Sequence, residues 1–193
     1  MREIFDAIAQ YAVAYKRLED IQRSLPEVLP RGDQKTGVIA EFFGRMYAKA
    51  RFLNCKLEYG STSEHAWDIK ITQEDNAILK IQIKAVSAHS EKGRISPIHA
   101  GWDELWLMRL NLELLPEAFW TYEASQSPWS SQTMRSRTMP RRGVTGTGSV
   151  ELRGGKDEFP ALWAAAVMAN PSLNLRANGM PPGPRHSAGV HFL

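Results

Sequence analysis

Two short segments carry side chains that could hydrolyse a phosphodiester bond. Asp68 lies in one of them, residues 66–71, and Gln82 and Lys84 lie in the other, residues 80–84. Carboxylate and amide oxygens are ligands for a hard divalent ion such as Mg²⁺, which promotes this hydrolysis. A lysine beside them can orient the attacking water or neutralise the charge that develops on the phosphate. The three residues therefore predict a metal-dependent hydrolytic site.

Both segments have the composition of strands, and the alternation of a strand decides where their polar side chains point. Gln82 and Lys84 share one face of their segment, because successive side chains of a strand point to opposite faces. Asp68 points away from the apolar side chains of its own segment. If the two strands pair in a meander, Asp68 lies beside Gln82 and Lys84 on a shared face.

The helix predicted over residues 35–54 offers a second carboxylate, Glu41. At about 100° per residue, Glu41 falls on the opposite side from the apolar stripe and shares its side with Gly37, Gly44 and Ala48. A face with such small side chains permits close approach to another element or to a substrate backbone. Glu41 is either part of the hydrolytic site or a surface glutamate.

This set of residues resembles the PD-(D/E)xK nuclease superfamily, which includes many type II restriction endonucleases, Holliday-junction resolvases and repair nucleases. Asp68, an interval of 13 residues and then Gln82-Ile83-Lys84 match its motif, and Glu41 matches the glutamate that a preceding helix often supplies. The resemblance covers residues 35–124 and implies an α-β-β-β-α-β type core. It also implies Asp68 and Gln82 as metal ligands, Lys84 as the catalytic lysine, and Glu41 as an accessory ligand of the metal or of water. The implied ion is Mg²⁺, with Mn²⁺ as a substitute.

Two residues depart from the usual pattern of the superfamily. Gln82 stands where Asp or Glu is more common, which removes one negative charge and should weaken ion binding, although glutamine variants occur. Trp67 stands at a position that is often proline but is commonly degenerate. The pattern therefore leaves room for a chain that keeps the nuclease fold without holding metal.

The remaining pattern predicts an α/β fold of the restriction-endonuclease-like kind, with a central mixed sheet of about five strands flanked by helices. Residues 1–193 are expected to form a single domain: an N-terminal helix within 1–30, the core in 35–124, a basic loop in 125–156, and a C-terminal helix and irregular tail in 157–193. The strands are expected at 56–59, 66–72, 78–86, 104–111 and 118–124. The N-terminal helix, over about residues 2–25, packs either on the core or on a second copy of the chain. Asp157 is expected to cap the last helix, which runs through Ala169.

Positive charge is concentrated in one segment. The net charge of the chain is +3, whereas residues 131–156 carry +5 and leave −2 for the rest. Arginine and neighbouring hydroxyls suit phosphate contacts, so Arg135, Arg137, Arg141 and Arg142 are predicted to bind nucleic acid. The alternative is a solvated mobile loop, with a short hairpin conceivable near 148–153.

Several other classes of protein are disfavoured by the composition. Cys55 is the only cysteine, which excludes a disulfide framework and multi-cysteine zinc sites, and the five histidines lack a metal-binding spacing. There is no Walker-type loop, so no nucleotide cofactor is expected. No apolar run approaches the ~18 residues that span a bilayer, and the first residues lack the apolar core of a signal peptide. A cytoplasmic protein without membrane contact is therefore expected.

These features predict a Mg²⁺-dependent endodeoxyribonuclease, most like a small type II restriction enzyme acting on double-stranded DNA. Cutting both strands usually takes two sites, so a homodimer is expected. Two alternatives remain: an inactive DNA-binding or assembly subunit with the same fold, and a structure-selective resolvase or repair nuclease.

Overall fold

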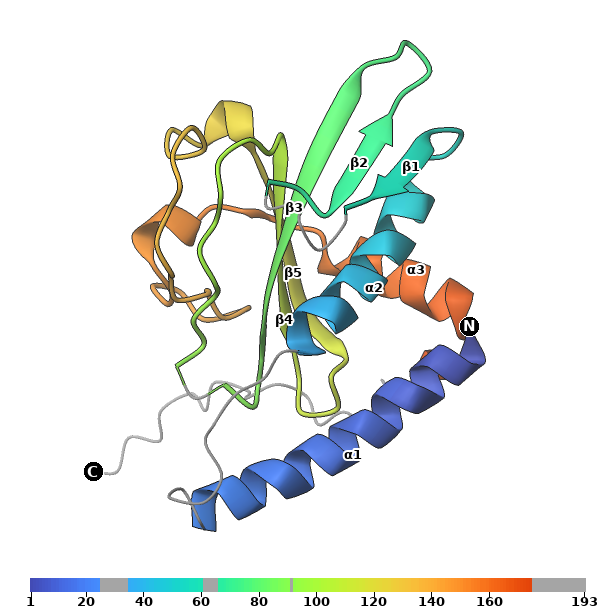
Figure 1. Ribbon diagram of the computed structural model, residues 1–193, viewed down its shortest axis with the longest axis vertical. Coiled ribbons are helices and arrows are strands. Elements are labelled where there is room, and N and C mark those ends of the chain that lie inside the picture. Colours follow the sequence, from blue (N-terminus) through green and yellow to red (C-terminus); the bar gives the residue numbers. More distant parts are fainter. Residues whose placement is uncertain (25–34, 61–65, 91, 175–193) are drawn as a thin grey trace, which may run out of the picture.

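The computed structural model describes residues 1–24, 35–60, 66–90 and 92–174, which form a mixed α/β structure (Figure 1). Within them, three α-helices accompany a six-stranded sheet whose strands lie in the order β1-β2-β3-β4-β5-β6. β3 and β4 pair in parallel, and every other neighbouring pair is antiparallel. The helices are α1 (Arg2–Ser24), α2 (Lys35–Arg51) and α3 (Phe159–Ala169). The strands are β1 (Lys56–Tyr59), β2 (Ile69–Thr72), β3 (Ile78–Ser87), β4 (Glu104–Leu110), β5 (Pro116–Glu123) and β6 (Lys156–Asp157).

The sheet buries a separate hydrophobic core on each face. Side chains of all three helices join the first core, where Phe43 of α2 and Leu162 of α3 are buried with Ile81, Ile83 and Trp106 of the strands. The second core is built under the segments that follow β3 and β5. Its buried apolar residues are Val86, Ile95, Ile98, Trp102, Leu105, Leu107, Ala118, Trp120, Tyr122, Met134, Met139 and Leu152. Both faces of β4 are therefore covered.

The predicted α/β class with a central mixed sheet is confirmed, and all five predicted strands are present with ends that shift by a few residues. The sixth strand was not predicted. It is Lys156–Asp157, which pairs with Thr121 and Trp120 of β5. Two residues are too few to produce an alternating pattern in a sequence.

The connection from β3 to β4 differs from the α-β-β-β-α-β core that the resemblance implies. The described residues between Ser87 and Glu104 contain no helix and run instead as an irregular segment. Isolated bridges join this segment to the later loop, at Arg94 with Thr138 and at Ile98 with Met134. The buried side chains of Ile95 and Ile98 attach it to the second core, so apolar anchoring replaces helical packing.

The segment 125–156 is largely a loop, as predicted, and buried apolar side chains anchor it to the sheet. Met134, Met139 and Leu152 are each at most 6% exposed and belong to the second core. The hairpin conceived near 148–153 is wrong, because Val150–Leu152 forms a short 3-10 helix. One turn of helix is enough to bury Leu152, the one buried side chain of this helix, without a pair of strands.

Asp157 contributes to the start of α3 from one position earlier than expected. Glu158 occupies the N-cap position without a side-chain capping bond. The Asp157 carboxylate accepts a hydrogen bond of 3.0 Å from the N–H of Phe159. The helix start is thus stabilised by a carboxylate, although Asp157 belongs to β6.

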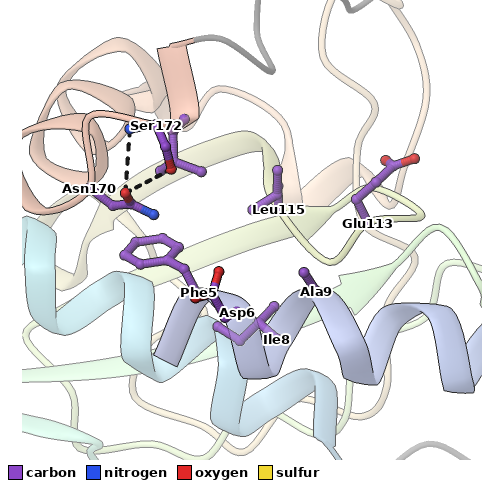
Figure 2. Close-up of a pocket in the computed structure, with 9 residues that line it drawn as sticks. Phe5, Asp6, Ile8, Ala9, Glu113, Leu115, Asn170 and Ser172 are labelled. Atoms are coloured by element: carbon purple, nitrogen blue, oxygen red, sulfur yellow. Dashed lines mark hydrogen bonds between the residues drawn. The ribbon is translucent and has the colours of Figure 1, made fainter. Parts of the chain in front are cut away.

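α1 packs on the core of its own chain. Phe5, Ile8, Ala12 and Tyr15 are buried, which supports the core-packing interpretation for that face of the helix. Figure 2 shows Phe5 directed toward Asn170, which follows α3, beside a cavity of about 10 Å³ that Ile8 and Leu115 also line, room for about one water. No helix in the described ranges has the length and apolar content needed to cross a membrane.

Candidate active site

The candidate residues meet where β3 continues past the end of β2. β2 pairs with β3 only over Ile78–Ile81, whereas β4 pairs with the other side of β3 from Ile81 to Ser87. Figure 1 shows β3 running on well beyond the short β2. From Gln82 onward, β3 therefore has no strand partner on its β2 side within the described chain. At this step in the sheet, backbone groups of β3 need hydrogen-bond partners other than a neighbouring strand.

Asp68 fills the step, directly before the first residue of β2. Its N–H donates to the Ile81 carbonyl at 2.8 Å, and its carboxylate accepts the N–H of Ile83 at 2.5 Å. The Asp68 carboxylate thus takes the place of a strand carbonyl as the acceptor of the Ile83 N–H. This replacement explains why β2 begins at Ile69 and not at residue 66. Burial raises the pKa of Asp68, while the Ile83 hydrogen bond and the charges of Lys84 and Arg45 oppose that rise.

Glu41 reaches the site because α2 lies unusually close to β3. A Cβ atom on Gly44 would stand 2.6 Å from Cδ1 of Ile83, so glycine lets the helix pack here without displacing the end of that side chain. The predicted close approach of the small-residue face is confirmed at Gly44. Glu41 lies one turn earlier and is half-buried. Burial raises its pKa, the charge of Asp68 raises it further, and the charges of Arg45 and Lys84 lower it.

Lys84 completes the group of charges. Burial lowers its pKa, and the negative charges of Asp68 and Glu41 raise it. Asp68 and Lys84 perturb the pKa of each other and of Glu41, and Glu41 perturbs that of Lys84, so the three groups lie within electrostatic reach. The structure brings Glu41, Asp68 and Lys84 together from a helix, a strand end and a second strand.

Gln82 lies on the same strand but is sealed beneath the segment that follows β3. Its side chain is 1% exposed. Its amide oxygen accepts the N–H of His99 at 3.1 Å, and its amide nitrogen donates to the Ala66 carbonyl at 3.2 Å. The observed bonds tie Ala66, two residues before Asp68, to the second face of the sheet.

The predicted nucleic-acid-binding arginines fall into two pairs. Arg137 forms an ion pair with Glu151 at 3.2 Å, and Arg142 forms one with Asp157 at 2.8 Å. The guanidinium of Arg142 also lies 4.5 Å from the ring centre of Phe159. Arg135 and Arg141 are exposed, and neither has an ion pair within the described part of the chain. DNA contact by all four stays a prediction, and it is better supported for Arg135 and Arg141.

Sequence reasoning missed a second cation near the carboxylates, Arg45. It lies one turn after Glu41 on α2, and Nη2 is 3.7 Å from Oε2 of Glu41. Its guanidinium carbon lies 4.1 Å from the ring centre of Tyr59, the last residue of β1. The spacing of four residues between Glu41 and Arg45 was the available signal, because residues i and i+4 are neighbours on a helix.

The donor set suits a hard cation. Two partly buried carboxylates repel each other and are incompletely solvated, and both conditions favour binding of a divalent ion. The Gln82 carbonyl is a third oxygen on the adjacent strand. No group of three His, Cys, Asp or Glu side chains that could hold a metal occurs in the described ranges, so a bound ion would also need amide, backbone or water oxygens. Mg²⁺ commonly keeps several waters in its shell, and such a site is compatible with it.

The chain is thus a mixed α/β protein with two carboxylates and a lysine clustered at a step in its sheet. No protein-family model matches it, and no curated protein matches it in sequence. Among solved structures it is similar to a bacterial homing endonuclease, I-Ssp6803I, at 14% identity and a TM-score of 0.37. That alignment covers 70% of this chain and 96% of the endonuclease chain. A likeness this weak transfers neither residue roles nor activity, so function has to rest on the site itself.

Proposed function

We propose that this chain is a metal-dependent DNA endonuclease with a site of the PD-(D/E)xK type. The observation that carries the proposal is the convergence of Glu41, Asp68 and Lys84 at the unpaired side of β3. Partial burial of three ionisable groups together disfavours their charged forms, and groups perturbed in this way cluster at functional sites. Two carboxylates can hold a divalent ion and one amine can assist the attacking water, which together suit phosphodiester hydrolysis.

The residues divide the work by their chemistry. Glu41 and Asp68 would hold Mg²⁺ or Mn²⁺, with the Gln82 carbonyl oxygen as a further donor. When bound, the ion would act as a Lewis acid toward an oxygen of the phosphate. Lys84 has a lowered pKa, so it carries a neutral amine more often than an ordinary lysine and can accept a proton from the attacking water. In its protonated form, the same amine can neutralise charge on the pentavalent phosphate.

The substrate in this proposal is double-stranded DNA, and the activity is most like that of a small type II restriction enzyme. Cleavage of both strands needs two sites, so the chain would act as a homodimer. The face of α1 that carries Phe5 and Ile8 is already used by the core of its own chain. A second copy that docks on α1 would therefore use its outer face, where Val13 is 73% exposed.

A second candidate function is supported by the state of Gln82. Its amide is neutral and is engaged at both ends by Ala66 and His99. If the Gln82 amide only makes these structural hydrogen bonds, the chain could bind DNA without binding a metal ion. In that case it would be a DNA-binding or assembly subunit.

The test compares the wild-type chain with Lys84→Ala, Asp68→Asn and a matched control, Lys80→Ala. Lys80 lies on the same strand, two residues before Gln82 on the same face, and its removal takes away the same charge. Purified proteins are incubated with mixed plasmid and phage DNA and with Mg²⁺ or Mn²⁺, and products are separated on a gel. Metal-dependent cleavage by wild type and Lys80→Ala, lost in the other two, is the expected result.

Two further outcomes distinguish the candidates. DNA binding in a gel shift without cleavage by any of the four proteins, together with no Mg²⁺ or Mn²⁺ binding in calorimetry, would support the inactive subunit. Cleavage that persists at the wild-type rate in Lys84→Ala or Asp68→Asn would refute the assigned site.

A further inference from the structure

Arg45 is held at the candidate site from two directions. On the helix side, its guanidinium contacts the Glu41 carboxylate at 3.7 Å. On the sheet side, it lies 4.1 Å from the ring centre of Tyr59. Tyr59 is followed by Gly60, whose N–H donates to the Asp68 carbonyl at 2.9 Å. Arg45 therefore bridges α2 and β1 beside the backbone that carries Asp68.

The hydrogen-bonding capacity of Arg45 is almost unused. A guanidinium has five N–H donors, yet Nε is buried without a hydrogen-bond partner among the described residues. The contact with Glu41 is longer than a hydrogen bond and acts through charge alone. The side chain is 40% exposed, so its outer nitrogens can reach a ligand.

The charge of Arg45 acts on the site. It lowers the pKa of Glu41 and that of Asp68, so it lies within electrostatic reach of both carboxylates. An ion pair at positions i and i+4 on an exposed helix face is usually weak and stabilises only the helix. Arg45 instead stacks on an aromatic ring, which restricts the side chain before any ligand arrives.

We propose that Arg45 is a phosphate-binding residue of this site and donates hydrogen bonds to oxygens of the scissile phosphodiester. The inference rests on the proposed nuclease function. A guanidinium fits two phosphate oxygens at once, which an ammonium group cannot do. Together with Lys84, Arg45 would give the phosphate two cations, and the Arg45 side chain is already ordered by its contact with the Tyr59 ring.

Salt-dependent DNA binding and cleavage together test this role. Arg45→Gln, Arg45→Lys and the control Lys49→Gln are compared with wild type, because Lys49 lies one turn later on α2 and is exposed. Affinity for a short duplex oligonucleotide is measured without metal over a range of salt concentrations. Loss of one phosphate contact reduces the slope of log affinity against log salt by about 0.9. Cleavage is measured with Mg²⁺ on a DNA that wild type cuts.

The proposal expects Arg45→Gln to lose about one unit of salt slope and to cleave about 10²-fold more slowly. Arg45→Lys should recover the slope but not the full rate, and Lys49→Gln should cleave like wild type. Thermal unfolding verifies that the variants are folded.

An unchanged salt slope in Arg45→Gln overturns the proposal. In particular, an unchanged slope with only a shift of the acidic limb of the pH-rate profile to higher pH would mean that Arg45 merely tunes Glu41 and Asp68. If wild type binds DNA but does not cleave it, the nuclease function fails, while a reduced slope in Arg45→Gln would still support the phosphate contact.

Discussion

The close contact between α2 and β3 is the feature most easily perturbed without touching a charged residue. In Gly44→Ala the new Cβ would stand 2.6 Å from Cδ1 of Ile83, about 0.8 Å inside the 3.4 Å at which ordinary contact begins. Over-packing of this kind costs about 1–3 kcal/mol, and the better helix propensity of alanine returns about 1 kcal/mol. A net loss of about 0–2 kcal/mol in the free energy of unfolding is expected.

The effect on cleavage should exceed the effect on stability. Glu41 and Arg45 flank Gly44 on the same helix, so a helix that moves off the strand carries both away from Asp68 and Lys84. A displacement near 1 Å at a catalytic centre can cost about 10²-fold in rate. We therefore expect kcat/KM of Gly44→Ala to fall by about 10–100-fold while the protein stays folded.

Ile83→Val removes the atom that the new Cβ would strike and supplies the decisive comparison. Alone it should cost about 0.5–1.5 kcal/mol through the small cavity it leaves. The double variant Gly44→Ala/Ile83→Val should recover most of the cleavage rate that Gly44→Ala loses. In urea unfolding, its loss of stability should be smaller than the sum of the losses in the two single variants. Strictly additive effects on both stability and rate would refute the argument, because distant or uncoupled sites behave in that way.

Three other predictions concern the buried polar groups. Asp68→Asn keeps an oxygen for the Ile83 N–H and should unfold at higher urea than wild type at pH 7. Burial raises the pKa of Asp68, so its negative charge destabilises the folded protein above that pKa, and the gain from Asp68→Asn should vanish as pH falls toward 3.8. Asp68→Ala leaves the Ile83 N–H without its acceptor and should lower the free energy of unfolding by about 1–3 kcal/mol. Lys84→Met should also be stabilising at pH 7, and urea titrations should show that gain shrinking as pH rises toward 10.5, since burial lowers the lysine pKa. Glu104→Ala removes the bidentate partner of Arg51 and the acceptor of the Trp106 indole N–H. Because Arg51 is partly exposed, we expect a loss of about 2 kcal/mol in the free energy of unfolding. Calorimetry should then show a Tm lower by about 4–8 °C. An unchanged Tm there would contradict a stabilising role for the ion pair.

The elements that sequence reasoning found are those with a regular hydrophobic period. β3 alternates Ile81 and Ile83 with polar residues, and both isoleucines are buried against the helices as that pattern predicts. The approach of α2 could also be anticipated, because Gly44 stands on a face of small side chains. Alternation and helical spacing thus carry enough information to place the framework of the site.

The features that escaped prediction depend on contacts between segments distant in the chain. Met134, Met139 and Leu152 have no common period, yet each is buried beneath the same face of the sheet. The burial of Gln82 is set by His99, which is 17 residues away. No local pattern encodes such a pairing, because it is decided by how an irregular segment folds back over the sheet.

The candidate site lies where one side of β3 has no neighbouring strand within the described chain. A strand with one unpaired side offers free N–H groups to any other strand, and such sides tend to aggregate. At the step between β2 and β3, the Asp68 carboxylate takes the N–H of Ile83, and the half-buried amine of Lys84 follows on the same strand. Charged groups at an unpaired strand side oppose the addition of another strand. Asp68 and Lys84, which oppose the addition of another strand, are also the groups that a metal ion and a phosphate would contact. Preventing aggregation and the proposed chemistry therefore both require charged residues at this position.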